Sequence, residues 1–129
     1  MLSKIVTGRI FKSAWFAKAT KKAGIDDNEL LKAIAQVMAG QADDLGGGVY
    51  KKRLSNNQYR SIILARSGNL WVYEYLFAKQ DQANIATDQL KRLRQIAQGY
   101  ARMTAKQIEV LVIDGDWIEI GPEPLEQKR

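Results

Sequence analysis

The chain has 129 residues, of which 46% are apolar and only two are proline, and this composition fits one domain spanning residues 1–129 with a core of its own. Twenty Lys and Arg residues against fourteen Asp and Glu residues give a formal net charge of +6, which favours an anionic partner but serves solubility equally well. The sequence has no histidine and no cysteine. This excludes a disulfide scaffold and a thiol nucleophile, and we expect no metal and no cofactor.

Charged residues interrupt every long apolar run, and the N-terminal segment lacks the apolar stretch of a signal peptide. We therefore expect no transmembrane helix and a cytoplasmic protein. Any chemistry must use Lys, Arg, Glu, Asp or Tyr side chains.

Two helices are predicted in the N-terminal third of the chain. A short β-compatible stretch from Arg9 to Lys12 leads into the first helix, which Gly24 ends. Its apolar positions recur at every fourth residue: Phe11, Trp15, Ala19 and Ala23. Its outer face carries a group of lysines, which we interpret as a solvated face: Lys18, Lys21 and Lys22.

The second helix is capped by Asp26 and Asp27 and ends at Gly40. Its predicted apolar stripe is Leu30, Leu31, Ile34, Ala35 and Met38. Three consecutive glycines at 46–48 then lead into a strand rather than a helix, so a Walker-type phosphate loop does not fit and a mobile turn is predicted.

Residues 45–85 contain three short apolar segments separated by two turns, which predicts an antiparallel meander. The first loop, Ser55 to Gln58, has an even number of residues, so Leu54 should lie opposite Tyr59 and Arg53 opposite Arg60. The meander then presents several cations on one face: Lys51, Arg53 and Arg60.

The second turn, around Ser67 and Gly68, allows two registers. A two-residue turn places the aromatic residues of the third strand on the arginine face, whereas a three-residue loop with Gly68 in the left-handed conformation places Glu74 there. Burial favours the three-residue loop, because the aromatic row then completes one core face. That row, which we assign to the core rather than to a base-stacking platform, is Trp71, Tyr73, Tyr75 and Phe77.

The opposite face would carry cations around one carboxylate, with Lys79 just beyond the last strand. Such a group is equally compatible with a surface ion-pair network. Arginine can bridge two phosphate oxygens and stabilise the charge that grows when a phosphodiester is attacked. Glu74, or a lysine whose pKa is lowered by neighbouring cations, could accept the proton of an attacking hydroxyl.

Two further helices are predicted after the meander. Thr87 caps the first, and a capping box formed by Thr104 and Gln107 begins the second. The first has an apolar stripe of Leu90, Leu93, Ile96, Ala97 and Tyr100, and outward cations Lys91, Arg92 and Arg94. The second directs Ile108, Leu111 and Val112 inward. A short strand from Trp117 to Ile120 and a frayed tail complete the chain.

The order of several motifs resembles the RelE/ParE toxin superfamily, most closely its RelE-like branch. The resemblance covers about Phe11 to Ile120 and rests on the segments LGGGVYKKRL, YRSII, FAKQDQANI and WIEI. It implies an α+β fold, with two N-terminal helices packed on a small antiparallel meander sheet, two C-terminal helices and a short final strand. It also implies the toxin of a type II toxin-antitoxin system.

RelE-type members cut messenger RNA in the ribosomal A site, whereas ParE-type members poison DNA gyrase. The family's strand arginine corresponds to Arg60 and its basic residue after the meander to Lys79, so we expect catalytic roles for Arg60, Glu74 and Lys79 and RNA binding by Gln80. The basic strand supplies the other expected RNA-binding residues: Lys51, Lys52 and Arg53.

Many relatives carry a longer Gly- and Lys-rich loop where this chain has Ser55 to Gln58. If that loop grips ribosomal RNA, the short loop leaves ribosome dependence open. We therefore expect a ribosome-dependent, metal-independent endoribonuclease that cuts messenger RNA, with a gyrase inhibitor or a catalytically silent binding module as alternatives. The expected partners are the ribosome, messenger RNA and a cognate antitoxin, a helix-turn-helix protein encoded next to the toxin.

Overall fold

A computed structural model describes residues 8–67 and 69–121. Four helices and six strands occur in these residues: β1 Arg9–Ser13, α1 Ala14–Ala23, α2 Asp27–Met38, β2 Asp43–Asp44, β3 Val49–Leu54, β4 Tyr59–Arg66, β5 Leu70–Ala78, α3 Thr87–Ala101, α4 Ala105–Ile113 and β6 Trp117–Gly121. Gly68, which was predicted in a left-handed turn, and the predicted tail after Gly121 lie outside the described residues.

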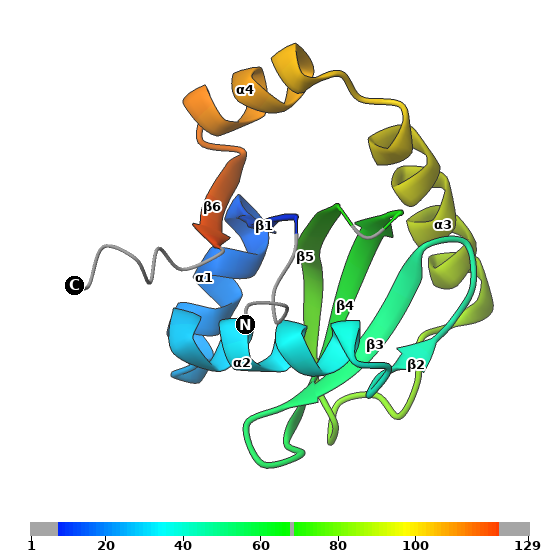
Figure 1. Ribbon diagram of the computed structural model, residues 1–129. Helices are drawn as coiled ribbons and strands as arrows, with labels where there is room; N and C mark the ends of the chain where they lie inside the picture. The colour runs from blue at the N-terminus through cyan, green and yellow to red at the C-terminus, as the bar shows by residue number, and fades with distance from the viewer. Residues whose placement is uncertain (1–7, 68, 122–129) are drawn as a thin grey trace.

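The strands form one sheet in the order β2-β3-β4-β5-β1-β6 (Figure 1). The predicted meander is its β3-β4-β5 part, and every neighbouring pair in the sheet is antiparallel except β1 and β5, which run parallel. The α+β fold class is therefore confirmed. The N-terminal and C-terminal strands enlarge the sheet by pairing with each other beside β5, a contact between distant parts of the sequence.

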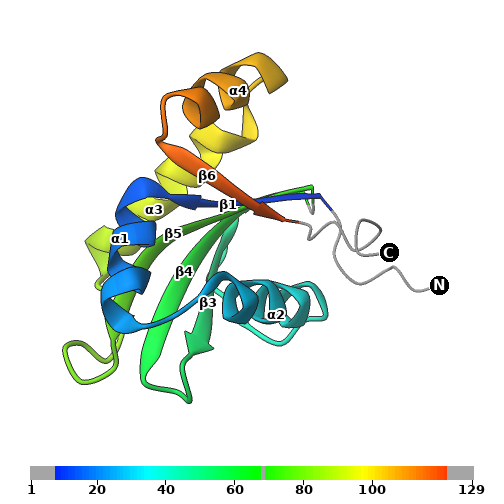
Figure 2. The ribbon, with the colours of Figure 1, turned by 90° about the vertical axis from the view of Figure 1, so that its left-hand side faces the viewer.

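Helices cover both faces of the sheet (Figure 2). On one face, α1 and α2 bury a cluster with inward side chains of β1, β3, β4 and β5. On the other face, α3 packs on β3 and β4 through Leu93 and Ala97, while α4 packs beside it through Ile108. Burial of these apolar side chains on two faces provides the main driving force for the fold.

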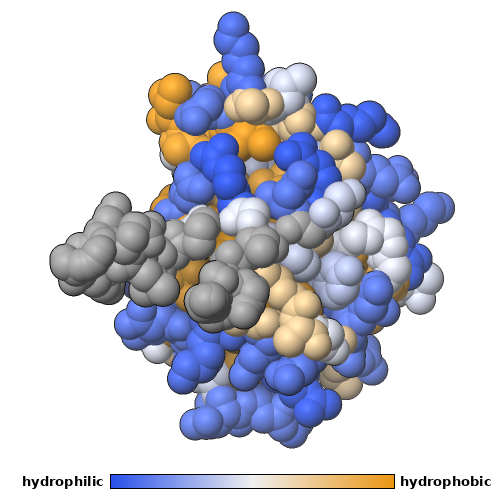
Figure 3. All heavy atoms as spheres, viewed as in Figure 1, coloured by the Kyte–Doolittle hydropathy of each residue, from blue (hydrophilic) through white to orange (hydrophobic). Residues whose placement is uncertain are grey.

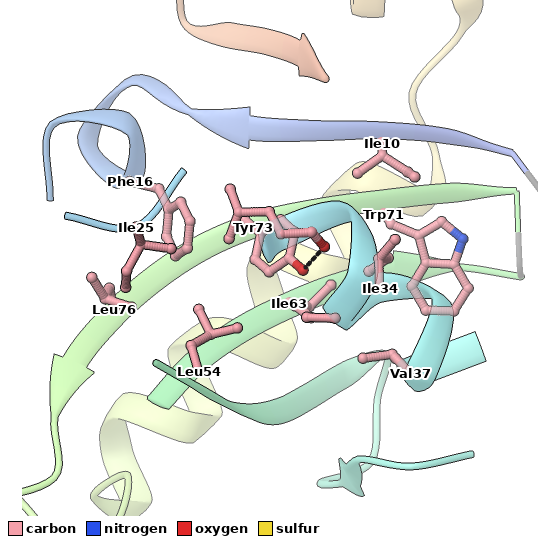
Figure 4. Close-up of a cluster of buried hydrophobic side chains, with 12 residues drawn as sticks. Ile10, Phe16, Ile25, Ile34, Val37, Leu54, Ile63, Trp71, Tyr73 and Leu76 are labelled. Atoms are coloured by element: carbon pink, nitrogen blue, oxygen red, sulfur yellow. Dashed lines mark hydrogen bonds between the residues drawn. The ribbon is translucent and has the colours of Figure 1, made fainter. Parts of the chain in front are cut away.

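The α1–α2 core is organised around Tyr73 (Figure 4). Its ring stacks on Phe16 with ring centroids 5.0 Å apart, and its hydroxyl donates a hydrogen bond of 2.6 Å to the Leu30 carbonyl. Burial raises the pKa of this phenol, so Tyr73 remains a neutral donor. The hydrogen bond satisfies a polar group that would otherwise destabilise the core.

The predicted helix boundaries are largely confirmed. Gly24 ends α1 in the left-handed conformation, and the Asp26 side chain accepts the Glu29 N–H at the start of α2. Thr104 and Gln107 form the capping box of α4. The prediction that Thr87 caps α3 is wrong, because Ala86 precedes the helix without a side-chain cap and Thr87 is its first residue.

The apolar stripe predicted for the first helix is correct only in part: Ala19 and Ala23 are partly buried against the α1–α2 core, whereas the other two positions are wrong. Phe11 belongs to β1, so the helical periodicity cannot begin there. The buried positions of α1 are Phe16 and Thr20, and Trp15 is 52% exposed. The buried face is thus rotated by one residue from the predicted stripe.

The meander has the predicted turns but not the predicted aromatic face. Arg53 pairs with Arg60, and Arg66 pairs with Leu70, so the second loop has the predicted three residues. However, the register shifts where Ile62 pairs with Tyr75 and Ile63 with Tyr73.

This β-bulge leaves Glu74 as the extra residue of β5. Before it, Trp71 and Tyr73 face α1 and α2 as predicted. After it, Tyr75 and Phe77 lie on the same face as Arg60, which corrects the prediction that all four aromatic residues share the core face.

Candidate active site at the end of the meander

The β3–β4 hairpin turn is built from three successive residues with positive φ: Ser55 at 53°, Asn56 at 55° and Asn57 at 73°. Serine and especially asparagine tolerate this conformation better than bulky residues. Glu29 of α2 accepts the Ser55 N–H, and Gln58 accepts the Lys79 N–H at 2.9 Å. The turn is therefore tied both to α2 and to the residue that follows β5.

Arg60 lies beneath this turn and is only 8% exposed. One guanidinium nitrogen, Nη1, donates to the carbonyls of Asn57 at 3.0 Å and Tyr59 at 3.3 Å. Within the described residues, Nε and Nη2 donate no hydrogen bond and no carboxylate forms an ion pair with Arg60. The buried cation thus keeps donors available for an anion.

A second cation, Arg53, lies directly opposite Arg60 across β3 and β4 and is exposed. Like charges at directly opposite positions of an antiparallel pair destabilise it. An anion between the two guanidinium groups would remove this repulsion. The pair is therefore better suited to binding an anion than to stabilising the hairpin.

Lys79 and Gln80 are exposed immediately after β5. Together with the hairpin turn they line a pocket of about 460 Å³, whose other residues are Asn56, Asn57, Gln58, Tyr59 and Ala78. The structure thus gathers four of the predicted site residues at one end of the meander: Arg53, Arg60, Lys79 and Gln80.

The other two residues of the basic strand have contacts elsewhere. Lys51 lies on the face of Arg53, but its ammonium group is 3.5 Å from the Asp43 carboxylate and 3.4 Å from Asn84 Oδ1. Lys52 alternates to the opposite face and donates to the Gln41 carbonyl at 3.0 Å. Desolvation, followed by repulsion from Arg53, lowers the pKa of Lys52.

Glu74 is separated from this cluster. It lies three residues before Phe77, the cross-strand partner of Arg60, which corresponds to about 10 Å along β5. Its Oε1 accepts a 3.0 Å hydrogen bond from the Tyr100 hydroxyl of α3. Burial raises the pKa of Glu74, and the bond from Tyr100 partly offsets this effect.

The three cations predicted to point outward from α3 differ in exposure. Lys91 and Arg92 are exposed, as predicted. The prediction that Arg94 projects outward is wrong, because it donates to the carbonyls of Leu45 and Gly46. It therefore holds the glycine turn that precedes β3.

Figure 3 shows how polar and apolar residues are distributed over one face of the molecule. On the face shown, polar residues cover the lower part, and apolar residues gather over α4 at the top, where Val110 and Ile113 are exposed. None of the described helices is long and apolar enough to cross a membrane.

The fold is thus an α+β arrangement with a cationic site at one end of a mostly antiparallel sheet. Residues 8–120 match the family model of the RelE toxin of the RelE/RelB toxin-antitoxin system. The chain belongs to this family, so the resemblance noted in its sequence is confirmed. It is the toxin of a type II toxin-antitoxin system, with a RelB-type antitoxin as its cognate partner. No curated protein and no solved structure matches the chain.

Some features of the site are not evident in the sequence. The bonds from Arg60 to the turn carbonyls depend on the conformation of three residues before it. Trp15 and Tyr75, which stack near the site, are far apart in the sequence. The sequence shows the alternating aromatic residues of β5, but only the bulge sets Trp71 and Tyr73 on one face of the sheet and Tyr75 and Phe77 on the other.

Proposed function

We propose that this toxin is a ribosome-dependent endoribonuclease that cleaves messenger RNA. The observation that carries the proposal is the Arg53–Arg60 pair, in which two cations oppose each other without a carboxylate partner among the described residues. Lys79 lies beside the same hairpin turn. This arrangement suits a phosphodiester, which carries one negative charge and gains more as it is attacked.

The RNA supplies its own nucleophile in the proposed reaction. The 2′-hydroxyl oxygen attacks the adjacent phosphorus, the bond from phosphorus to the 5′-oxygen breaks, and a 2′,3′-cyclic phosphate and a 5′-hydroxyl result. One protein group accepts the proton of the 2′-hydroxyl, and another donates a proton to the leaving oxygen. The chain itself therefore needs no covalent intermediate and no metal of its own for this step.

Arg60 has the geometry to stabilise the phosphorane-like transition state, because Nε and Nη2 remain open while Nη1 is anchored. Arg53 and Lys79 hold the phosphate from either side, and Gln80 and Lys52 contact the RNA on its flanks. Lys51 supports this strand through Asp43 and Asn84. The separation of Glu74 along β5 argues against this residue as the general base for a phosphate held at Arg60.

The short Ser55–Gln58 turn would reach less far into the ribosome than a long basic loop. We propose that the exposed cations of α3, Lys91 and Arg92, add contacts to the ribosomal RNA phosphates. The reaction would then take place where messenger RNA is translated, in the cytoplasm.

The cognate antitoxin would silence the toxin by laying an acidic segment across this cationic end, or by blocking its entry to the ribosome. We propose that it is a small helix-turn-helix protein encoded by the neighbouring reading frame. Charge steering should make its association slower as salt rises, with little change in dissociation.

The direct test is cleavage of a defined messenger RNA on purified, programmed ribosomes, with the new 5′ ends mapped by primer extension. We expect cleavage by the wild type, and loss of about 100- to 1000-fold in rate in Arg60→Ala. Arg102→Ala removes the same charge from an exposed position outside the proposed RNA contacts and serves as the matched control. Gln in place of Glu74 and Ala in place of Lys79 separate the two candidates for the general base.

Growth arrest with intact messenger RNA would contradict the proposal. In that case, DNA breaks after expression from a tightly regulated promoter would indicate a gyrase inhibitor. The absence of both effects would indicate a catalytically silent binding module.

A further inference from the structure

A groove lies between α1 and the second half of β5. β1 pairs only with residues Leu70 to Tyr73 of β5, so the remaining part of this strand borders α1 instead of another strand. The groove has a volume of about 380 Å³. Its walls include Trp15 and Lys22 from α1 and Tyr75 and Phe77 from β5.

Aromatic rings form a continuous shelf in this groove. Trp15 stacks on Tyr75 with ring centroids 5.1 Å apart and an interplanar angle of 26°. The Tyr75 ring in turn packs against the Phe77 ring, with ring centroids 5.9 Å apart. Because Tyr75 supports one side of the Trp15 ring and the side chain remains 52% exposed, the indole offers a flat apolar surface that is already held in place.

The shelf is continuous with the candidate active site. Tyr59, Ala78 and Gln80 line both this groove and the 460 Å³ pocket that contains Lys79. Phe77, at the inner end of the shelf, is the cross-strand partner of Arg60. An extended chain that places a phosphate near Arg60 and Lys79 would therefore pass over the aromatic rings.

We propose that the Trp15–Tyr75 shelf stacks a nucleobase of single-stranded RNA next to the phosphate bound by Arg60 and Lys79. This inference rests on the proposed function and adds a base-binding site to it. A nucleobase fits better than a peptide because the shelf is flat, aromatic and connected to the pocket that contains Lys79. The groove wall itself carries one cation, Lys22, and one carboxylate, Asp81. Stacking is tolerant of sequence, so the shelf would position RNA without selecting one base.

The test uses a short single-stranded RNA with 2′-O-methyl groups, which cannot be cleaved, and a matched series in which one base at a time is removed. Binding to the full chain is measured by anisotropy of a labelled RNA and by tryptophan emission. Trp71 and Trp117 are 6% and 3% exposed, so Trp15 is the tryptophan that added RNA can reach. Ile113→Ala, at a 79% exposed apolar residue of α4, is the matched control.

We expect RNA to quench the accessible tryptophan emission and Trp15→Ala to weaken binding about 5- to 150-fold, the range for losing one stacked base. Trp15→Phe should restore most of the affinity, and Ile113→Ala should bind as the wild type does. Removal of one particular base from the RNA should weaken wild-type binding to the same extent. With that RNA, Trp15→Ala should cause no further loss, because the stacking partner is already absent.

The inference is overturned if Trp15→Ala binds the complete RNA with an affinity within about twofold of the wild type. It is equally overturned if Trp15→Ala lowers the affinity for the complete RNA and for every RNA that lacks one base by the same factor. It is also overturned if Trp15→Ala releases the co-expressed antitoxin while RNA binding is unchanged, since the groove would then hold a peptide. The ribosomal cleavage assay distinguishes these failures from failure of the proposed function. If the wild type cleaves messenger RNA on ribosomes but Trp15→Ala does not change RNA binding, the base-binding site is rejected and the proposed ribonuclease activity is not.

Discussion

Two turns in this toxin are each held by an arginine that makes two hydrogen bonds to backbone carbonyls, and they differ in which guanidinium nitrogens those bonds use. Arg94 of α3 donates through Nε and Nη2 to the carbonyls around the Gly46–Gly48 turn. Arg60 of β4 donates to the carbonyls of the Ser55–Gln58 turn through Nη1 alone. Arg94 therefore uses its Nε–Nη2 edge for the backbone, whereas Arg60 leaves that edge without a hydrogen bond in the described residues.

The difference shows how a structural arginine can be distinguished from a functional one. Where the Nε–Nη2 edge is bonded to backbone carbonyls, as in Arg94, this bidentate edge is committed to the fold. Where one edge is anchored and the other is open, the group is held in position and can still bind a ligand.

The largest expected effect is on RNA cleavage. Arg60→Ala should reduce the rate about 100- to 1000-fold, and Arg60→Lys should also fail because one ammonium cannot replace the bidentate fork. Arg94→Ala should keep the rate within about threefold of the wild type at a temperature where it is folded. Single-turnover cleavage on programmed ribosomes measures all three. If folded Arg94→Ala loses as much of the cleavage rate as Arg60→Ala, unbonded guanidinium nitrogens do not distinguish a functional arginine from a structural one.

The next effect is on stability, where Arg94→Ala should have a larger effect than Arg60→Ala, the reverse of the order expected for cleavage. Arg94→Ala leaves the Leu45 carbonyl without its side-chain donor, and should lower the free energy of unfolding by about 1–3 kcal/mol. Arg60→Ala should cost less, because it also removes a buried cation that has no carboxylate partner in the described part of the chain. Urea denaturation gives both values, and a larger loss in Arg60→Ala would contradict this order.

Gly47→Ala probes the glycine turn itself. Gly47 has φ +67°, and a Cβ there would lie 2.9 Å from Cγ of Arg94. We expect a loss of about 1–2 kcal/mol from the left-handed backbone together with the displaced arginine. In an Arg94→Ala background the clash is absent, so the same substitution should cost less. If the losses in the free energy of unfolding are additive in the double variant, the Arg94 side chain moves away from the new Cβ without destabilising the protein.

The smallest expected effect concerns Glu74, which α3 covers through Tyr100. Burial raises its pKa above the ordinary value of 4.5, so between 4.5 and the raised pKa the folded state binds more protons than the unfolded state. Its stabilising contribution is therefore complete below 4.5 and is lost as pH rises through the raised pKa. Glu74→Gln keeps an acceptor for Tyr100 and should remove this pH dependence. Urea denaturation from about pH 4 to pH 8 measures the change, and an unchanged slope would show that another group titrates.

The local features were predictable because each depends on neighbouring residues. The caps of α2 and α4, the end of α1 at Gly24 and the pairing of Arg53 with Arg60 follow from side-chain capping, glycine conformation and the parity of a loop. The predicted three-residue loop before Leu70 is also present, although the burial argument that favoured it holds only for Trp71 and Tyr73.

The sequence by itself thus determined the family, the fold class and the opposition of two arginines across a hairpin. Only the tertiary structure decided that Glu74 is the extra residue of a bulge, that Tyr75 turns toward Trp15, and that Arg94 points inward to the glycine turn. Each of these depends on where α1 or α3 packs against β3 to β5, which is a contact between segments far apart in the chain. A one-residue shift in a strand reverses the face of every following side chain, so local periodicity cannot supply that information.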